Sequence, residues 1–302
     1  MSGIKIDLID YLGWKDSIRI SNGLVELVVL TQVGIRIIHY GYLGEENMLF
    51  INDEQKGSAG GDGWKHYGGH RLWHSPQVGY RCNEPDNEKV THSIFENGVI
   101  LTQNTEPTAK IQKVMKISLD ENSTRVSIQH QLINRNVWPV TLSAWALTML
   151  GTNGISYIPI CQRDTMFLPN FNLVSWPFTH LGDKRMTISD KYISVVFDAS
   201  CEPWFKIGIS NQDGWASYFV NGNVFVKKFE HHEDERYPDF GCSYETYTDK
   251  MIFELESLSP LRTIDQDESL LHQEEWFLAK AEKRPETADE FDSLYLHIIE
   301  SL

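Results

Sequence analysis

The chain has 302 residues, of which 41% are hydrophobic and 12% aromatic, enough apolar material for one large core. Its 27 lysines and arginines against 42 aspartates and glutamates give a net charge of −15, which disfavours binding to nucleic acid or to an anionic membrane surface. Because the sequence has neither a run of about 20 apolar residues nor a basic and then apolar leader pattern, we expect a soluble cytoplasmic protein.

Short segments that alternate apolar with polar residues recur from residue 4 to about residue 280, and this pattern predicts an all-β protein. We expect strands at 17–29, 33–40, 90–97, 99–104, 109–120, 124–133, 140–150, 191–198, 206–210, 215–220 and 251–258. Asn97-Gly98 and Asn221-Gly222 each lie between two such strands and predict antiparallel hairpins, because both turn positions favour positive φ. Without a linker or an internal repeat, residues 1–302 are expected to form a single domain.

The longest turn-rich stretch, residues 52–87, combines glycines with aromatic residues and histidines, and long loops of this kind in compact domains are usually functional. Flat rings stack on the C–H faces of sugars, while arginine and histidine hydrogen-bond to hydroxyl groups. The stretch therefore predicts a site for a small polyhydroxylated molecule, with candidate binding residues Trp64, His70, Arg71, Trp73 and His74.

A metal site is the alternative for the same stretch. On a helix, His66, His70 and His74 would align on one face, but Gly68 and Gly69 disfavour that helix, so we expect no metal. We also expect no disulfide and no zinc or redox motif, because the four cysteines are far apart and include no Cys-x-x-Cys pair.

The segment 251–258 is the most informative strand. With a period of two, Glu254 and Glu256 point to one face, and Ile252 and Leu258 flank them there. A carboxyl group among apolar neighbours has a raised pKa and can act as a general acid or base, although an ordinary solvent-facing strand would also explain the pattern. Glu245, which lies close to two tyrosines, is a further candidate for the pocket.

A C-terminal helix is predicted from residue 287. Thr287 and Glu290 form a capping-box pattern, and the helix carries an apolar stripe of Phe291, Leu294, Tyr295, Ile298 and Leu302. We expect the stripe to cover an edge or a face of a sheet; the alternative is contact with a second subunit, so the protein is expected to be a monomer or a homodimer.

Several segments, in order along the chain, resemble the galactose-mutarotase-like superfamily, which includes the aldose 1-epimerases. These segments are Val33-Gly-Ile-Arg36, Asn47-Met-Leu-Phe50, Pro139-Val-Thr-Leu-Ser143, Leu255-Glu256-Ser257 and Ile264-Asp-Gln-Asp-Glu268, followed by His272 and Trp276-Phe277. The resemblance implies a large antiparallel β-supersandwich with a sugar-binding cleft, to which Arg36 contributes. It also implies that Glu256 is the general base, and that no cofactor takes part.

The chain departs from the epimerase pattern at one position. Where the epimerases have Asn-His after the Pro-Val-x-Leu run, this sequence has Ala144-Trp145, so the usual general acid is absent and Trp145 becomes a candidate binding residue. The segments Gly68-Gly-His-Arg-Leu-Trp73 and Tyr237-Pro-Asp-Phe-Gly-Cys242 are instead similar to a bacterial branch of mutarotase-like proteins. In that setting His70 is the candidate acid.

We therefore expect a carbohydrate-binding mutarotase-like protein that interconverts the anomers of an aldose or a modified sugar by Glu/His acid–base catalysis. A non-catalytic sugar-binding or sensor protein is the first alternative, supported by Trp145. The second is a glycoside hydrolase or polysaccharide lyase in which Glu254 and Glu256 divide the acid and base roles, although hydrolysis normally places the two carboxyl groups on opposite sides of the bond.

Overall fold

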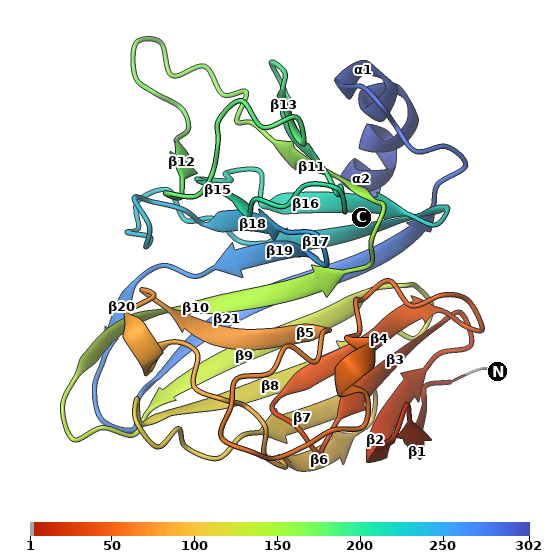
Figure 1. Ribbon diagram of the computed structural model, residues 1–302, viewed down its shortest axis with the longest axis vertical. Helices are drawn as coiled ribbons and strands as arrows, with labels where there is room; N and C mark the ends of the chain where they lie inside the picture. Colours follow the sequence, from red (N-terminus) through yellow and green to blue (C-terminus); the bar gives the residue numbers. More distant parts are fainter. Residues whose placement is uncertain (1–2) are drawn as a thin grey trace.

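In the computed structural model, which describes residues 3–302, the chain forms two antiparallel β-sheets and a C-terminal helix (Figure 1), so the predicted all-β class is confirmed. Within these residues the first sheet has eleven strands. Across the sheet they run β1 (Lys5–Tyr11), β2 (Trp14–Ser21), β3 (Val25–Leu30), β4 (Arg36–Tyr42), β5 (His70–Ser75), β10 (Val140–Leu150), β19 (Phe253–Leu258), β18 (Tyr244–Thr248), β15 (Phe205–Ile209) and β12 (Leu173–Ser175), with β20 (Arg262–Ile264) paired to β10.

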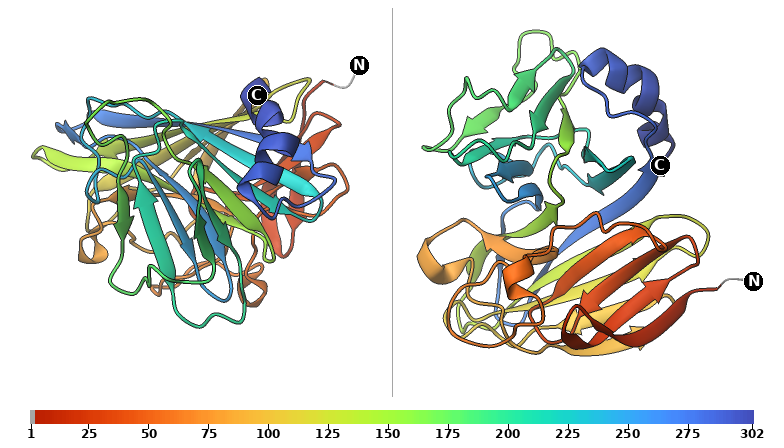
Figure 2. Two further views of the ribbon diagram at one scale, coloured as in Figure 1. Left: turned by 90° about the horizontal axis from the view of Figure 1, so that it is seen from above. Right: turned by 45° about the vertical axis from the view of Figure 1, so that its right-hand side comes forward.

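The second sheet has ten strands in the same part of the chain. Their order is β13 (Met186–Ile188), β14 (Tyr192–Val196), β11 (Ile155–Pro159), β16 (Trp215–Val220), β17 (Asn223–Phe229), β21 (Ser269–Lys280), β9 (Val126–Asn134), β8 (Ile111–Leu119), β7 (Gly98–Thr102) and β6 (Thr91–Phe95). Figure 2 shows β1–β4 (red to orange) as one layer in front of β6–β9 (yellow).

One apolar core fills the space between the sheets. Ile18 and Ile20 of β2 contribute to it from the first sheet, while Met115 and Ile117 of β8 contribute from the second. In β8 every second side chain is buried, because alternate side chains of a strand point to opposite faces. The sandwich therefore follows directly from the alternation in the sequence.

Five neighbouring strands in the middle of the first sheet, β5, β10, β19, β18 and β15, position the site. Their register places Arg71, Leu147, Glu256, Glu245 and Gly208 in one row across the sheet. Leu147 packs with Trp73 and Trp145 in a cluster separate from the core between the sheets, so the row forms part of the outer face.

Two expectations about turns need correction. The segment 17–29 is two strands, because the chain turns at residues 22–24 between β2 and β3. Asn221 and Gly222 adopt φ values of 50° and 71° in the β16–β17 hairpin, as predicted. The β6–β7 hairpin also forms, but Gly98 has no positive φ; a Cβ there would lie 1.9 Å from the Ile117 carbonyl oxygen, so the close approach of β8 requires this glycine.

Residues 52–87, predicted as a long loop, contain the central strand β5. Two short 3₁₀ turns, Asp53–Gln55 and Gly79–Arg81, lie on either side of it. Gly68 and Gly69, immediately before the strand, have φ values of 106° and 73°, and a Cβ on either would lie 2.2 Å from a neighbouring carbonyl oxygen. The two glycines thus let the chain enter the middle of the sheet rather than form an open loop.

The C-terminal helix begins at the predicted cap. Thr287 Oγ1 accepts a hydrogen bond from the Glu290 backbone N–H at 3.2 Å, and α1 (Ala288–Phe291) continues through a π-helical turn, Asp292–Leu296, into α2 (His297–Ser301). The predicted stripe is wrong in part, because the wider π turn rotates the apolar face. Phe291, Tyr295 and Ile299 are buried, while Leu294 and Leu302 are exposed.

The buried side of this helix covers the outer face of the second sheet, as Figure 1 shows for α1 and α2 beside β11 and β16. The helix packs on an aromatic cluster that includes Tyr157, Tyr192, Trp215 and Phe219. Covering a sheet face was one of the two roles expected for it.

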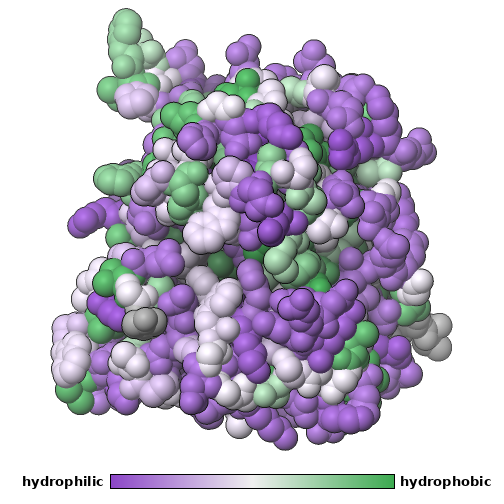
Figure 3. All heavy atoms as spheres, viewed as in Figure 1, coloured by the Kyte–Doolittle hydropathy of each residue, from purple (hydrophilic) through white to green (hydrophobic). Residues whose placement is uncertain are grey.

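The face of the molecule in Figure 3 is mostly hydrophilic, with hydrophobic groups gathered near its middle. All four cysteines are free thiols. None of the helices within residues 3–302 combines the length and the hydropathy needed to cross a bilayer.

Candidate functional site

A cleft with a volume of about 340 Å³ lies on the outer face of the first sheet, within the range of sites for small molecules. Its walls are mainly aromatic: they include Trp64, Trp73, Trp145, Trp176, Phe178, Trp204 and Tyr247. Trp73 and Trp145 face each other across β5 and β10, with ring centroids 5.3 Å apart in an edge-to-face arrangement. Such rings suit the C–H faces of a sugar better than a flat polar surface does.

Four side chains form a hydrogen-bonded group in the floor of the cleft. Glu256 Oε2 accepts hydrogen bonds from Trp145 Nε1 at 2.6 Å and from Lys206 Nζ at 2.8 Å. The Lys206 ammonium also lies 2.7 Å from Glu245 Oε2. One oxygen of each glutamate, Oε1, is buried without a hydrogen-bond partner in the described residues. The floor therefore holds two carboxyl groups around a single ammonium.

Glu254 lies on the same strand and the same face as Glu256, and it also lines the cleft. Burial raises the pKa of Glu254 to about 8, with a further contribution from repulsion by Glu256, while Arg71 and Lys206 act in the opposite direction. Burial likewise raises the pKa of Glu245, although Lys206 opposes it. At neutral pH Glu254 therefore carries a proton that it can donate.

Arg71 and His66 complete the polar lining. The Arg71 guanidinium stacks on Trp73, 4.1 Å from the ring centroid, and on Trp64, 5.1 Å away. Burial lowers the pKa of His66 to about 3, with smaller contributions from Arg71 and Arg36, so this imidazole is neutral.

Six of the ten residues singled out in the sequence line the cleft: Trp64, Arg71, Trp73, Trp145, Glu254 and Glu256. Glu245 lies in the floor behind Lys206. The remaining three, Arg36, His70 and His74, lie elsewhere.

His70 is on the inner face of β5 and fully buried between the sheets, so the expected role as the acid of the cleft needs correction. Its Nδ1 is hydrogen-bonded to Thr148 Oγ1 at 2.9 Å and its Nε2 to His130 Nε2 at 2.8 Å. Alternate side chains of a strand point to opposite faces, so His70 and Leu72, on either side of Arg71, both point to the core. His70 therefore lies on the face opposite the cleft.

Arg36 and His74 also have structural partners in place of the expected ligand. Arg36 is fully buried, donates to the Gly68 carbonyl and pairs with Asp86 at 2.6 Å. His74 lies 3.3 Å from Glu106, which also pairs with Lys113. Neither side chain lines the cleft, and both stabilise the packing around β5.

Lys206, Trp176 and Trp204 line the cleft but are not among the site residues predicted from the sequence. Lys206 and Trp204 flank the buried Phe205, and this alternation is the local signal that would have placed both on one face. Trp176 lies in a connecting segment, so only the tertiary structure brings it to within 4.8 Å of the Lys206 ammonium.

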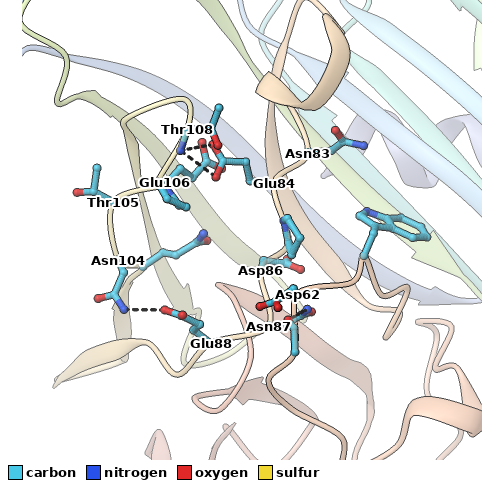
Figure 4. A pocket seen from close by; sticks show the side chains of 15 residues that line it. Asp62, Asn83, Glu84, Asp86, Asn87, Glu88, Asn104, Thr105, Glu106 and Thr108 are labelled. Carbon is cyan, nitrogen blue, oxygen red and sulfur yellow. Dashed lines mark hydrogen bonds between the residues drawn. The ribbon is translucent and has the colours of Figure 1, made fainter.

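The described residues also form a larger hollow of about 520 Å³ (Figure 4), whose lining shares Trp64 with the cleft. Four of its five carboxyl groups, all except that of Asp62, already have partners. Glu84 accepts from the backbone N–H groups of Thr108 and Ala109, Glu88 accepts from Asn104, and Asp86 pairs with Arg36. These partners leave little chemistry for a ligand there.

His70, His130 and Glu274 could in principle hold a metal ion, since one donor atom from each lies within 4.8 Å of the others. The Lys227 ammonium, however, lies 2.7 Å from Glu274 and is fully buried with it. A lysine cation at this position opposes a second positive charge, so the residues do not fit a metal site.

The sequence matches no family model and none of the curated proteins. Solved structures, by contrast, are similar over most of the chain. A candidate mutarotase from Salmonella typhimurium has a TM-score of 0.59 and 11% identity, covering 93% of this chain and 95% of its own. A candidate aldose 1-epimerase from Klebsiella pneumoniae has a TM-score of 0.57 and 11% identity, covering 98% of this chain and 87% of its own.

A galactose mutarotase-like protein from Lactobacillus casei is similar too, with a TM-score of 0.55 and 8% identity, covering 87% of this chain and 100% of its own. The chain therefore has the galactose mutarotase-like fold, as the resemblance in the sequence implied.

Proposed function

We propose that the protein binds a sugar in the aromatic cleft and interconverts its anomers. The observation that carries the proposal is the pair of carboxyl groups, Glu254 and Glu256, on the cleft face of one strand beneath aromatic walls. One member of the pair has a raised pKa and the other accepts hydrogen bonds from an ammonium and an indole. The two groups thus differ in the way that an acid and a base must differ.

In the proposed reaction, Glu256 accepts the proton of the anomeric hydroxyl through Oε1, the oxygen that has no partner. Glu254 donates its proton to the ring oxygen, the bond from that oxygen to the anomeric carbon breaks, and the open aldehyde forms. Closure on the other face of the carbonyl, with the two proton transfers reversed, gives the second anomer. The reaction needs no oxidant or reductant, because atoms and electrons balance within the sugar and the two carboxyl groups.

Trp145 cannot replace the histidine of the epimerases as an acid, since an indole N–H does not ionise near neutral pH. Its role in the proposal is to orient Glu256 by hydrogen bonding to Oε2, together with Lys206. The proton donor is therefore reassigned from His70, which is buried between the sheets, to Glu254.

The test is anomer exchange of glucose, galactose and other aldoses, followed by NMR magnetisation transfer. We expect exchange above the buffer rate, and a loss of about 100-fold or more in Glu256→Gln, as is typical for removal of a general base. Glu121→Gln, in the exposed turn between β8 and β9, is the matched control and should exchange like the wild type.

A non-catalytic sugar-binding protein is the second candidate. It is favoured by the burial of Glu256, whose side chain is 0% exposed and whose Oε2 is engaged by two donors. In that case saturation-transfer NMR would detect a bound sugar without exchange, and Glu256→Gln would alter affinity only. If none of the tested aldoses showed exchange or binding, both candidate functions would be wrong.

A further inference from the structure

The cleft contains a buried cation, Arg71, that forms no ion pair among residues 3–302. The Arg71 side chain is 1% exposed, and its Nε and Nη1 have no hydrogen-bond partner among residues 3–302. No carboxylate of the described residues lies within ion-pair distance of it. The other two fully buried arginines differ: Arg36 pairs with Asp86, and Arg185 pairs with Asp183.

Such an arrangement is costly for the protein alone. A guanidinium removed from water is normally paired or hydrogen-bonded, because the loss of hydration otherwise remains uncompensated. Stacking on Trp73 and Trp64 compensates in part, and it also holds the guanidinium plane in a fixed orientation at the cleft wall. The N–H groups that remain unpaired are available to a ligand in the cleft.

The charges around Arg71 favour an anion in particular. Lys206, the other cation of the cleft, is already neutralised between Glu245 and Glu256. Glu254, an acidic residue of the same lining, has a pKa raised to about 8 and is therefore mostly protonated at neutral pH. Arg71 is thus the uncompensated charge of the site, even though the whole chain carries −15.

We propose that Arg71 is an oxyanion subsite and that the sugar bound in the cleft is an acidic one, which carries a carboxylate or a phosphate. The guanidinium fork matches either group through paired N–H···O hydrogen bonds, and Trp64 and Trp73 hold it in place. This inference rests on the proposed function, because it specifies the class of sugar that the same cleft takes.

The test compares the binding of glucuronate and galacturonate, glucose 6-phosphate, and the neutral sugars glucose and galactose by isothermal titration calorimetry. We expect an acidic sugar to bind at least about tenfold more tightly than its neutral counterpart, and the carboxylate and phosphate series to show which oxyanion the subsite takes. Arg71→Met should abolish this preference, while Arg71→Lys should retain part of it.

Arg163→Met is the matched control, because it removes one cation from an exposed ion pair with Glu233, outside the cleft lining. It should leave the preference for acidic sugars unchanged. Thermal unfolding gives a second readout: Arg71→Met should keep or raise the midpoint of the ligand-free protein, since an uncompensated charge is removed. In Arg71→Met, an acidic sugar should no longer raise the midpoint of thermal unfolding as it does in the wild type.

Equal binding of acidic and neutral sugars by the wild type would overturn the inference and leave the proposed function intact. A lower melting temperature of folded Arg71→Met with an unchanged preference would also overturn it, because Arg71 would then be structural. Binding of none of the sugars would contradict the proposed function as well. The wild-type comparison and Arg71→Lys keep the test decisive if Arg71→Met does not fold.

Discussion

At the scale of single residues, the proposed chemistry depends on two glutamates of one strand having different surroundings. Glu254 and Glu256 are two positions apart on β19, yet of these two glutamates only Glu256 forms an ion pair with the ammonium of Lys206. Glu254 has the apolar side chain of Ile252 and the ring of Tyr247 as neighbours in the cleft lining. Burial without a hydrogen-bonding cation therefore favours the protonated form of Glu254.

This difference predicts the pH dependence of anomer exchange. Because the proposed donor must be protonated and the pKa of Glu254 is raised to about 8, exchange due to the protein should be largely retained at pH 7 and decline as the pH rises through about 8 to 9. Glu254→Gln should lower the rate about 100-fold and remove the alkaline decline. A wild-type rate that rises steadily to pH 10 after subtraction of the buffer rate would exclude Glu254 as the donor.

The placement of individual site residues could be predicted only where the strand was recognised. Glu254 and Glu256 were assigned to one face because the alternation in 251–258 is clear. The turn-rich stretch 52–87 gives no signal that separates His70 from Arg71, although in β5 they point to opposite faces. Lys206 carries no local signal of its role, since its partners Glu245 and Glu256 come from other strands.

At the scale of elements, most strands follow from the sequence. The bounds of β10 and β16 agree with the predicted segments 140–150 and 215–220, because a continuous apolar or alternating run ends at polar turn residues. β5 could not be predicted in this way. Its six buried residues include two histidines and an arginine, and the burial of the histidines depends on tertiary partners, Thr148 for His70 and Glu106 for His74.

The C-terminal helix provides a prediction at this scale. Phe291 is fully buried and stacks on Tyr157, with ring centroids 4.5 Å apart, and on Trp215 at 5.9 Å. Phe291→Ala should lower the free energy of unfolding by about 3 to 5 kcal/mol, because it leaves a cavity in an aromatic cluster. Urea denaturation measures this value.

Leu294→Ala is the control for that measurement. Leu294 lies on the same helix but is 39% exposed, so its truncation should cost less than about 1 kcal/mol. Equal losses for the two variants would mean that the π turn does not set the buried face of the helix as described.

At the scale of the whole molecule, a buried polar network connects the two sheets beneath the cleft. From the first sheet, β5 contributes His70, β10 contributes Thr148 and β19 contributes Ser257. Lys227 of β17, in the second sheet, donates to Thr148 Oγ1 and to the carbonyls of Ala146 and Leu255. The strands that hold Arg71 and Glu256 on their outer face are thus fixed from the inner face.

The histidines of this network make stability depend on pH. Burial lowers the pKa of His130 and of His272 to about 3, with further contributions from other groups such as Lys227, and it lowers the pKa of His70 well below its usual value. Above the unfolded pKa of about 6.5 the histidines are neutral in both states and add no pH dependence. Below it the unfolded chain takes up protons that the folded protein does not, so stability falls as the pH decreases.

Glu245 and Glu254 oppose this trend, since their raised pKa values favour the folded state as the pH falls from about 8 towards 4.5. Comparing the wild type with a histidine variant separates the contribution of the histidines to stability from that of the two glutamates. His272→Gln removes one histidine while its amide can still bond to Ser257, so the stability of the wild type relative to the variant should fall by about 1.4 kcal/mol per pH unit below about pH 6. Urea unfolding from pH 7.5 to 4.5 measures this difference.

His92→Gln is the control for that series, because His92 is an exposed residue of β6 outside the network. Its unfolding curves should follow those of the wild type at every pH. If His272→Gln also followed the wild type, the histidines would not be held neutral between the sheets.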